Sequence, residues 1–405
     1  MAEFSGGLKV QVYGGSIADP VSNALVTVFD DENAELYTVY TDPDGETEIL
    51  PLAAPDPVSS EYPEGERPYF TYNAEIRADG YIPLRIEGIQ IFPDGISLQN
   101  APLERGTGDE QLIIVPAPAL NGDYPEKIPE EEVKTVPEES GFVVLDSVVI
   151  PEFVIVHSGT PDSDAPDYYV PFKDYIKNVA SSEIYSTWDE AAIRANVLAI
   201  ISFTLNRVYT EWYRNKGYGF TITNSTAYDQ SFEFGRTIFE EISRIVDETF
   251  TTYIKRRGGD QPLFAQYSDG REVVRAGWLS QWGSQELAQR GFNTLDILRF
   301  YYGDDIYLEQ ADIVGGVPLS YPGAELQRGS RGSAVAVIQR QLARIGQTYY
   351  SIGRPAADGI FGAETEASVL AFQQVFNLPQ TGIVDLATWY QISQVYVALE
   401  RLAVL

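Results

Sequence analysis

Apolar and polar residues alternate along the first 105 residues, in short segments separated by turn sequences. LKVQVYG (8–14) and ALVTVFD (24–30) alternate in this way, as strands with one buried face do. Asp-Gly pairs at 44–45, 79–80 and 94–95 mark turns between such segments. The pattern predicts an all-β sandwich over residues 1–105.

Residues 106–150 lose this periodicity. The stretch PAPALNGDYPEKIPEEEVKTVPEESG (116–141) is rich in Pro and Glu, a composition that cannot bury enough apolar surface to fold alone. Two interpretations stay open. The segment is either an acidic linker or a propeptide that a protease can reach.

Residues 151–320 contain both the alternation typical of strands and the spacing of apolar residues typical of helices, which predicts an α+β domain. A strand is expected in VIPEFVIVHSG (149–159) and a helix in VPFKDYIKNVASSEI (170–184). Thr187 and Glu190 form a capping box that predicts the start of a long helix, which runs to about Asn215 with one apolar face. Further helices are expected at 234–255, from 284 onwards and at 295–302.

Residues 321–405 predict an all-α domain with a helix–loop–helix–loop–helix pattern. Gly359 and Gly362 supply turn conformations that other residues resist. Phe361, Phe372 and Trp389 are expected in its core. The chain as a whole is therefore expected to be multidomain: a sandwich, an acidic segment, an α+β domain and a helical domain.

Charge and hydropathy narrow the possible partners. The net charge of −31 argues against nucleic acid and anionic membranes as partners. Residues 1–150 hold 29 acidic and 7 basic side chains, so most of that charge lies in the first third. No run of about 18 apolar residues occurs, so no transmembrane helix is expected. The first 15 residues lack the basic and apolar regions of a signal peptide. We therefore expect the chain to stay in the cell that makes it or to leave by another route.

The inventory of reactive side chains restricts the chemistry. The chain has no Cys and one His, His157, which excludes a thiol nucleophile and argues against a Ser-His-Asp triad. His157 is interpreted as a structural residue on its strand. Any catalysis must then come from carboxylates, Tyr, Lys, Ser or Asn, and a carboxylate-based attack on a glycosidic bond fits that inventory.

Two flanking domains resemble known modules. LQRGSRGSAVAVIQRQLARIG (326–346), DGIFGAETEASVLAFQQVFNL (358–378) and TGIVDLATW (381–389) together resemble a peptidoglycan-binding domain of the three-helix type. The resemblance implies peptidoglycan as a partner and a wall-cutting domain nearby. Residues 1–105 resemble the small sandwiches of the carboxypeptidase-regulatory or prealbumin-like type, which are usually accessory modules.

Four segments of the middle domain resemble, in order, the stage II sporulation protein D family of lytic transglycosylases. They are DYIKNVASSEIYSTWDEAAIRANVLAIISFTLNR (174–207), TNSTAYDQ (223–230), GWLSQWGSQELA (277–288) and ILRFYYGDDIYL (297–308). The resemblance implies cleavage of MurNAc–GlcNAc bonds to 1,6-anhydro products. It also implies that Glu183 is the catalytic acid.

Other polar residues of these segments are secondary candidates. Tyr175, Gln230, Ser280 and Gln281 are proposed to hold the sugar or the developing charge, with capping or ordinary polar surface as the alternative. Asp229 could orient a neighbour. Tyr301 and Tyr302 are expected in the core.

The order of the four parts resembles the clostridial spore cortex-lytic enzymes of the SleC type. That resemblance implies a zymogen, made in the mother-cell cytosol, deposited in the spore and activated by a subtilisin-like protease. The sequence departs from related sporulation proteins at Arg275 and Ala276, where those proteins often carry His. Zinc-binding Cys and His are also missing, so no metal and no cofactor are expected.

The chemistry explains why one carboxylate would suffice. The substrate's own 6-hydroxyl attacks the anomeric carbon, so the enzyme needs one group that first donates and then accepts a proton. That acid must stay protonated until it is used, which requires a partly desolvated site. In the sequence, Glu183 is flanked by the apolar residues Ala180, Ile184 and Trp188, which could exclude water from such a site. A non-catalytic wall-binding scaffold and a vegetative or phage-like wall enzyme remain as alternatives.

Overall fold

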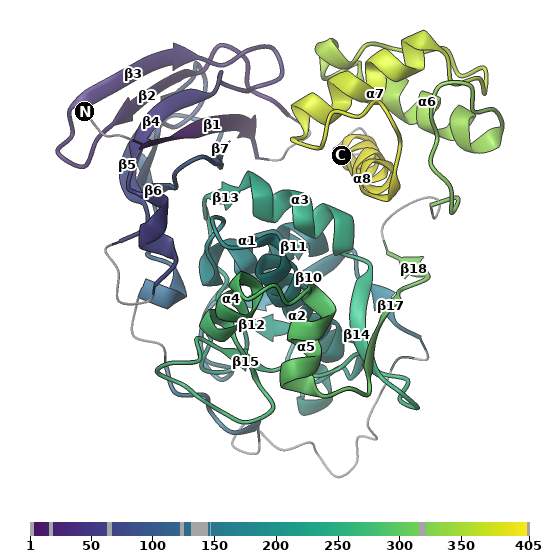
Figure 1. The fold of residues 1–405 in the computed structure, drawn as a ribbon. Helices are drawn as coiled ribbons and strands as arrows, with labels where there is room; N and C mark the ends of the chain where they lie inside the picture. Colours follow the sequence, from purple (N-terminus) through teal and green to yellow (C-terminus); the bar gives the residue numbers. More distant parts are fainter. Residues whose placement is uncertain are drawn as a thin grey trace. The chain divides into compact units, whose positions relative to one another are not determined.

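The computed structural model describes residues 4–15, 19–62, 67–121, 125–130, 145, 147–315 and 321–402. The chain forms two compact units. The first comprises residues 1–54, 69–115 and 316–405, and the second comprises residues 55–68 and 116–315. Each is described by itself (Figure 1). The β-rich N-terminal region, the mixed middle and the helical C-terminal region agree with the expected fold class.

The N-terminal part of the first unit contains two sheets. In one, β1 pairs in parallel with β7 and antiparallel with β4. The other has the strand order β3-β2-β5-β6-β8. The strands are β1 (Phe4–Gly14), β2 (Leu25–Phe29), β3 (Glu35–Tyr40), β4 (Leu50–Ala54), β5 (Phe70–Arg77), β6 (Leu84–Ile91), β7 (Ile96–Leu103) and β8 (Gln111–Ile114).

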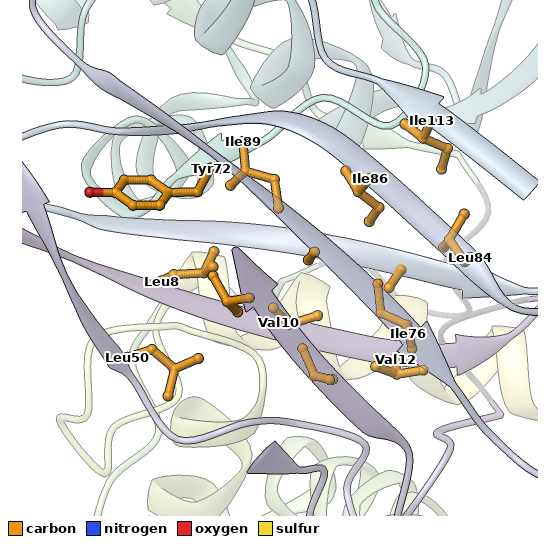
Figure 2. Close-up of a cluster of buried hydrophobic side chains, with 14 of the residues drawn as sticks. Leu8, Val10, Val12, Leu50, Tyr72, Ile76, Leu84, Ile86, Ile89 and Ile113 are labelled. Atoms are coloured by element: carbon orange, nitrogen blue, oxygen red, sulfur yellow. The ribbon is translucent and has the colours of Figure 1, made fainter. Parts of the chain in front are cut away.

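Both sheets contribute to one hydrophobic core. Figure 2 shows Leu8, Val10 and Val12 of β1 among Ile76 of β5 and Ile86 of β6. Alternation places these side chains on one face, and all five are fully buried. Each such burial stabilises the fold by about 1.5–3 kcal/mol.

The structure corrects the expected end of this β region. Strand β8 pairs in parallel with β6, so regular structure continues to residue 114, beyond the expected end of the sandwich at residue 105. Ile113 is buried in the same core. Residues 111–114 of segment 106–150 therefore belong to this sheet, and whether the segment is a linker or a propeptide stays open. Residues 122–124, 131–144 and 146 of that segment lie outside the described residues.

The C-terminal part of the first unit is helical, as expected. It contains α6 (Ser333–Ile345), the short η5 (Tyr350–Ile352), α7 (Ala363–Val375) and α8 (Leu386–Leu402). Phe361, Phe372 and Trp389 are buried, which confirms their expected place in the core.

Two buried glutamines tie the loops of this part to its helices. Gln339 accepts a hydrogen bond from Gly359 N (2.8 Å) and donates to Ile360 O. Gln373 accepts from Gly382 N (2.9 Å) and donates to Ile383 O. Both glycines have positive φ, +73° and +69°, a conformation that other residues resist. The glycines and glutamines of the C-terminal domain therefore act together: each glutamine hydrogen-bonds the backbone of a turn that needs the glycine.

The second unit is built around α2 (Glu190–Tyr209), which contacts α1, α3, α4 and α5 (Figure 1). Its other helices are α1 (Phe172–Glu183), α3 (Glu240–Thr249), α4 (Gln281–Gln289) and α5 (Thr294–Tyr302), with the short η1 (Pro57–Ser60), η2 (Ala119–Asn121) and η4 (Arg214–Lys216). Its strands are β9 (Val149–Ile150), β10 (Phe153–His157), β11 (Asp167–Pro171), β12 (Ile222–Thr223), β13 (Ile238–Phe239), β14 (Thr252–Arg256), β15 (Tyr267–Ser268), β16 (Leu279–Ser280), β17 (Ile306–Gln310) and β18 (Ile313–Val314).

Helix α2 is the core helix of this unit. Among the described helices it alone is long and apolar enough to cross a membrane by length and composition, but 83% of that window is buried inside the fold. Buried residues lie on nearly all of its sides. The sequence pattern predicts only one buried face, so more of the helix is buried than expected.

Several expected helix boundaries are wrong. Asp189, not Thr187, caps α2 by accepting a hydrogen bond from Ala191 N, while Thr187 Oγ1 is buried and has no hydrogen-bond partner among the described residues. The helix ends at Tyr209 rather than near Asn215, where a short 3₁₀ turn replaces it. The helix expected at 234–255 is shorter, because residues 252–256 form β14 and pair with β17.

Candidate active site

Glu183 is the last residue of α1 and is fully buried. Its Oε1 accepts a hydrogen bond from Ser231 N (2.7 Å), and its Oε2 lies 3.4 Å from the donor Gln281 Nε2. The apolar neighbours expected from the sequence, including Ala180, Ile184 and Trp188, are buried around the end of the helix. The carboxyl group is therefore held in a water-poor setting with only a few polar partners.

Local contacts explain why the Ser231 backbone lies next to the Glu183 carboxyl group. Asn178 of α1 exchanges two hydrogen bonds with the backbone of Glu233, at 2.8 and 2.9 Å. Arg236 donates to Ser181 O at the C-terminal end of α1, where a cation interacts favourably with the helix dipole. Together these contacts fix the loop after Gln230 against the last turn of α1.

Tyr175 and Gln230 join Glu183 in one hydrogen-bond network. The Tyr175 hydroxyl donates to Gln230 Oε1 (3.0 Å), which also accepts from Thr204 Oγ1 (2.7 Å). Gln230 Nε2 donates to Ile200 O and to the Tyr267 hydroxyl (3.0 Å). The Tyr267 hydroxyl in turn hydrogen-bonds Glu183.

Gln230 and Tyr175 are held firmly within this network. Gln230 is fully buried, and its amide oxygen and nitrogen each have two partners, which uses the whole hydrogen-bonding capacity of the side chain. Tyr175 is also fully buried and stacks on Phe232. The role of both in holding sugar stays a prediction.

The environment of Glu183 favours its protonated form. Burial raises the pKa of the Glu183 carboxyl group to about 7, although the Ser231 N–H, the Tyr267 hydroxyl and the Lys127 ammonium act in the opposite direction. Loss of hydration disfavours the charged carboxylate, whereas donors and a nearby cation favour it. A carboxyl group with a pKa near neutrality can both donate and take up a proton at neutral pH.

Gln281 and Ser280, at the start of α4, differ in what they can offer a ligand. Gln281 is fully buried, and among the described residues its Oε1 has no hydrogen-bond partner. It can therefore accept a bond from a sugar hydroxyl or amide beside Glu183. Ser280 instead caps α4 by accepting from Gly283 N (2.9 Å). Ser280 thus acts as a helix cap, which is one of the two roles that the sequence left open.

Asp229 is bound into an ion-pair cluster by donors to both of its carboxylate oxygens. Its Oδ1 accepts from Arg207 Nε (2.9 Å), and its Oδ2 accepts from the Tyr213 hydroxyl (2.6 Å) and from Thr223. These donors occupy both carboxylate oxygens. Asp229 is therefore a structural anchor for the loop that carries Gln230.

Two residues of the site were not found from the sequence. Tyr267 lies on β15, which pairs with β16, and its hydroxyl hydrogen-bonds Glu183. Lys127 comes from the Pro/Glu-rich stretch. Its ammonium donates to Asp229 O (2.9 Å) and interacts electrostatically with Glu183. No periodicity or motif marks either residue.

His157 and the tyrosines of α5 lie outside this network. His157 Nδ1 is 2.8 Å from Asp167 Oδ1 and Nε2 is 3.2 Å from Ser163 Oγ, but Ser163 donates its proton to Thr160 O. The three side chains join the end of β10 to the loop that follows it and to the start of β11, as a structural role requires. Tyr302 is buried and Tyr301 half-buried.

The expected absence of a metal and a cofactor stays a prediction. Within the described ranges, no group of three or more His, Cys, Asp or Glu side chains is arranged to hold a metal ion. Arg275, at the position where related sporulation proteins often carry His, is exposed and stacks over Trp278.

Comparisons with known proteins bear on the C-terminal part of the chain. A family model described as "Putative peptidoglycan binding domain" matches residues 331–392. A solved structure, "The crystal structure of SleB N-terminal domain", is similar at 26% sequence identity over 19% of this chain and 99% of that chain, with a TM-score of 0.17. The search of curated proteins finds no match. The chain therefore carries a peptidoglycan-binding domain at residues 331–392, which supports peptidoglycan as a partner.

Proposed function

We propose that the chain is a peptidoglycan lytic transglycosylase, made as a zymogen, that cleaves MurNAc–GlcNAc bonds of spore cortex. The observation that carries the proposal is Glu183, a buried carboxyl group whose pKa lies near 7, in the same chain as a peptidoglycan-binding domain. The domain holds the chain on the polymer, and the acid supplies the chemistry.

The geometry supports a mechanism with a single carboxyl group. Glu183 donates its proton to the glycosidic oxygen as the bond from that oxygen to the anomeric carbon breaks. The substrate's 6-hydroxyl oxygen then bonds to the anomeric carbon, and its proton returns to the Glu183 carboxylate. No water is consumed. Asp229, the acidic residue next to Gln230, is engaged by Arg207 and Tyr213 and is not free to activate a water, as a hydrolase's second carboxylate would.

The zymogen and its setting form part of the proposal. Residues 116–121 and 125–130 belong to the compact unit that contains Glu183, so the acidic segment reaches the site that it would restrain. We propose that a subtilisin-like protease cuts between residues 131 and 150. The spore cortex is the proposed location. The domain boundaries remain those expected from the sequence, except that regular β structure reaches residue 114.

One experiment tests the reaction. A recognition site for a specific protease is placed within residues 131–144 of the full chain, and the protein is incubated with purified cortex fragments before and after cutting. We expect 1,6-anhydro-muramic products, identified by mass spectrometry, after cutting. Reducing-end products that carry added water would instead indicate a hydrolase, and binding without any product would indicate a wall-binding scaffold.

Replacement of Tyr267 by Phe tests the network around the acid. Without the hydroxyl, the carboxylate form of Glu183 loses a donor that stabilises it, so the pKa of Glu183 should rise. Because the acid is active when protonated, the fall in activity at alkaline pH should move to higher pH than in the cut parent chain. The measurement is the pH profile of anhydro-sugar release. Tyr253→Phe, a buried tyrosine whose hydroxyl donates to Glu309, is the matched control. An unchanged profile for Tyr267→Phe would remove this role.

A further inference from the structure

The ammonium group of Lys127 belongs to the buried cluster around Glu183. Lys127 is 9% exposed, its Nζ donates to Asp229 O (2.9 Å), and it lies 6.0 Å from the centre of the Tyr267 ring. Its strongest favourable electrostatic interaction is with Glu183. A backbone carbonyl, an aromatic face and a carboxyl group are the partners that an ammonium ion prefers.

The segment that delivers Lys127 is anchored at both of its ends. We call residues 116–121 and 125–130 the strap. At one end Pro116 O accepts from Arg236 Nη1 (2.6 Å), and at the other Glu130 pairs with Arg207 at 2.5 Å. Between them η2 packs on α1, and Ile128 N donates to Ala227 O (2.8 Å). The strap is therefore held by several contacts in addition to that of Lys127.

We propose that the space beside Glu183 is an ammonium-binding subsite and that Lys127 is an internal ligand which fills it until the strap leaves. An ammonium group is costly to bury unless its partners compensate, and an apolar side chain would hold the strap at a lower cost. A lysine at position 127 is explained if the groups around it bind positive charge.

The subsite has a natural use in the reaction proposed above, and this step of the argument rests on that function. Glycosidic cleavage passes through a transition state with positive charge near the anomeric carbon. Groups that bind an ammonium beside the acid would stabilise that charge. While Lys127 is present, the same groups are occupied. The ligands expected after the strap leaves are primary ammonium compounds and protonated amino sugars.

Chemical complementation in the full chain tests the subsite without any need for activity. Lys127→Ala removes three methylene groups and the ammonium, which n-propylammonium can replace. We expect the unfolding temperature of Lys127→Ala to rise saturably with n-propylammonium, because a ligand that binds only the folded state stabilises it. Neutral 1-propanol should have no such effect. The parent chain should not respond, since its subsite is filled, and Glu126→Ala, an exposed strap neighbour, should behave like the parent.

Two outcomes of this experiment contradict the subsite. One is a Lys127→Ala protein, folded by circular dichroism, that does not respond to n-propylammonium. The other is an equal response to 1-propanol. The double variant Lys127→Ala/Glu183→Gln adds a check on the partner, because loss of the carboxylate should weaken the response.

A second test of the subsite measures the activity of the intact chains. Lys127→Ala should release anhydro sugars faster than the intact parent by about tenfold or more, the factor expected when a charge-assisted hydrogen bond is lost. Lys127→Arg, which keeps the charge, should stay close to the parent, and n-propylammonium should inhibit Lys127→Ala again.

The two arms separate the subsite from the function. If n-propylammonium binds Lys127→Ala but even the cut parent chain releases no sugar, the proposed function fails and the subsite stands. If the cut parent chain is active but Lys127→Ala is neither faster nor responsive to n-propylammonium, the subsite fails and the function stands.

Discussion

Glu183→Gln should lower the rate of anhydro-sugar release by the cut chain by about 10²–10⁴-fold. Glutamine keeps the shape of the side chain and can still accept the hydrogen bond from Ser231 N, but it has no proton to transfer. The group lost is the one whose pKa is raised to about 7 by burial. The measurement is the rate of product formation on cortex fragments at fixed enzyme concentration.

The control for this variant separates catalysis from folding and wall binding. Glu190→Gln changes an exposed carboxylate at the start of α2 that is paired with Arg194 and Arg244, and it should leave the rate unchanged. Both variants should still sediment with insoluble peptidoglycan, because residues 331–392 are intact. A Glu183→Gln protein with near-normal release would show that another group is the acid.

Asp247→Ala should lower the free energy of unfolding of the second unit by about 3–5 kcal/mol, since it leaves buried positive charge without a partner. Asp247 of α3 accepts from Lys173 (3.1 Å) and Lys177 (2.8 Å) of α1. Asp247 and Lys173 are each 1% exposed. A loss of this size is a large part of the 5–15 kcal/mol that stabilises a typical domain.

Denaturant unfolding with tryptophan fluorescence can measure this loss, because four of the five tryptophans lie in the second unit. Glu248→Ala, at the next and exposed position, is the matched control. It breaks only surface pairs with Arg194 and Arg244, which contribute about 1 kcal/mol or less. Equal losses for the two variants would contradict the role assigned to Asp247.

The sign of the pH dependence follows from the pKa of Asp247. Burial acts to raise this pKa, but Lys173 and Lys177 outweigh it, so the net shift is downward. A lowered pKa in the folded state stabilises the fold above the ordinary Asp pKa of about 3.9, and this contribution is lost as the pH falls below that value. The difference between the parent chain and Asp247→Ala should therefore shrink in acid.

Local patterns in the sequence determined much of the fold. Alternation placed Val10 and Val12 in the core of the N-terminal sheets, and helical periodicity placed α1, α5 and the C-terminal helices. These features depend on neighbours within a few residues, because a strand repeats every two positions and a helix every 3.6. Boundaries failed where a tertiary contact competed with local preference, as at β14, where pairing with β17 replaced the end of a helix.

The candidate site was determined only in part by the sequence. Glu183 and its apolar neighbours were marked by a motif and by local composition. Tertiary structure decided that Tyr175 and Gln230 are connected to Glu183 through Tyr267, and that Ser280 is a cap. Those roles rest on hydrogen bonds between side chains far apart in the chain, which leave no periodic trace.

Lys127 shows this limit most clearly. Its surroundings in the sequence are acidic and rich in Pro, which predicts a segment without a core of its own. That prediction says nothing about what such a segment does against an already folded surface. The hydrogen bond from Lys127 to Asp229 O spans 102 positions, and it exists because α1, β15 and the loop before Gln230 together form a buried place for a positive charge. The sequence alone determined that this segment could not fold independently, and only the tertiary structure placed its lysine beside Glu183.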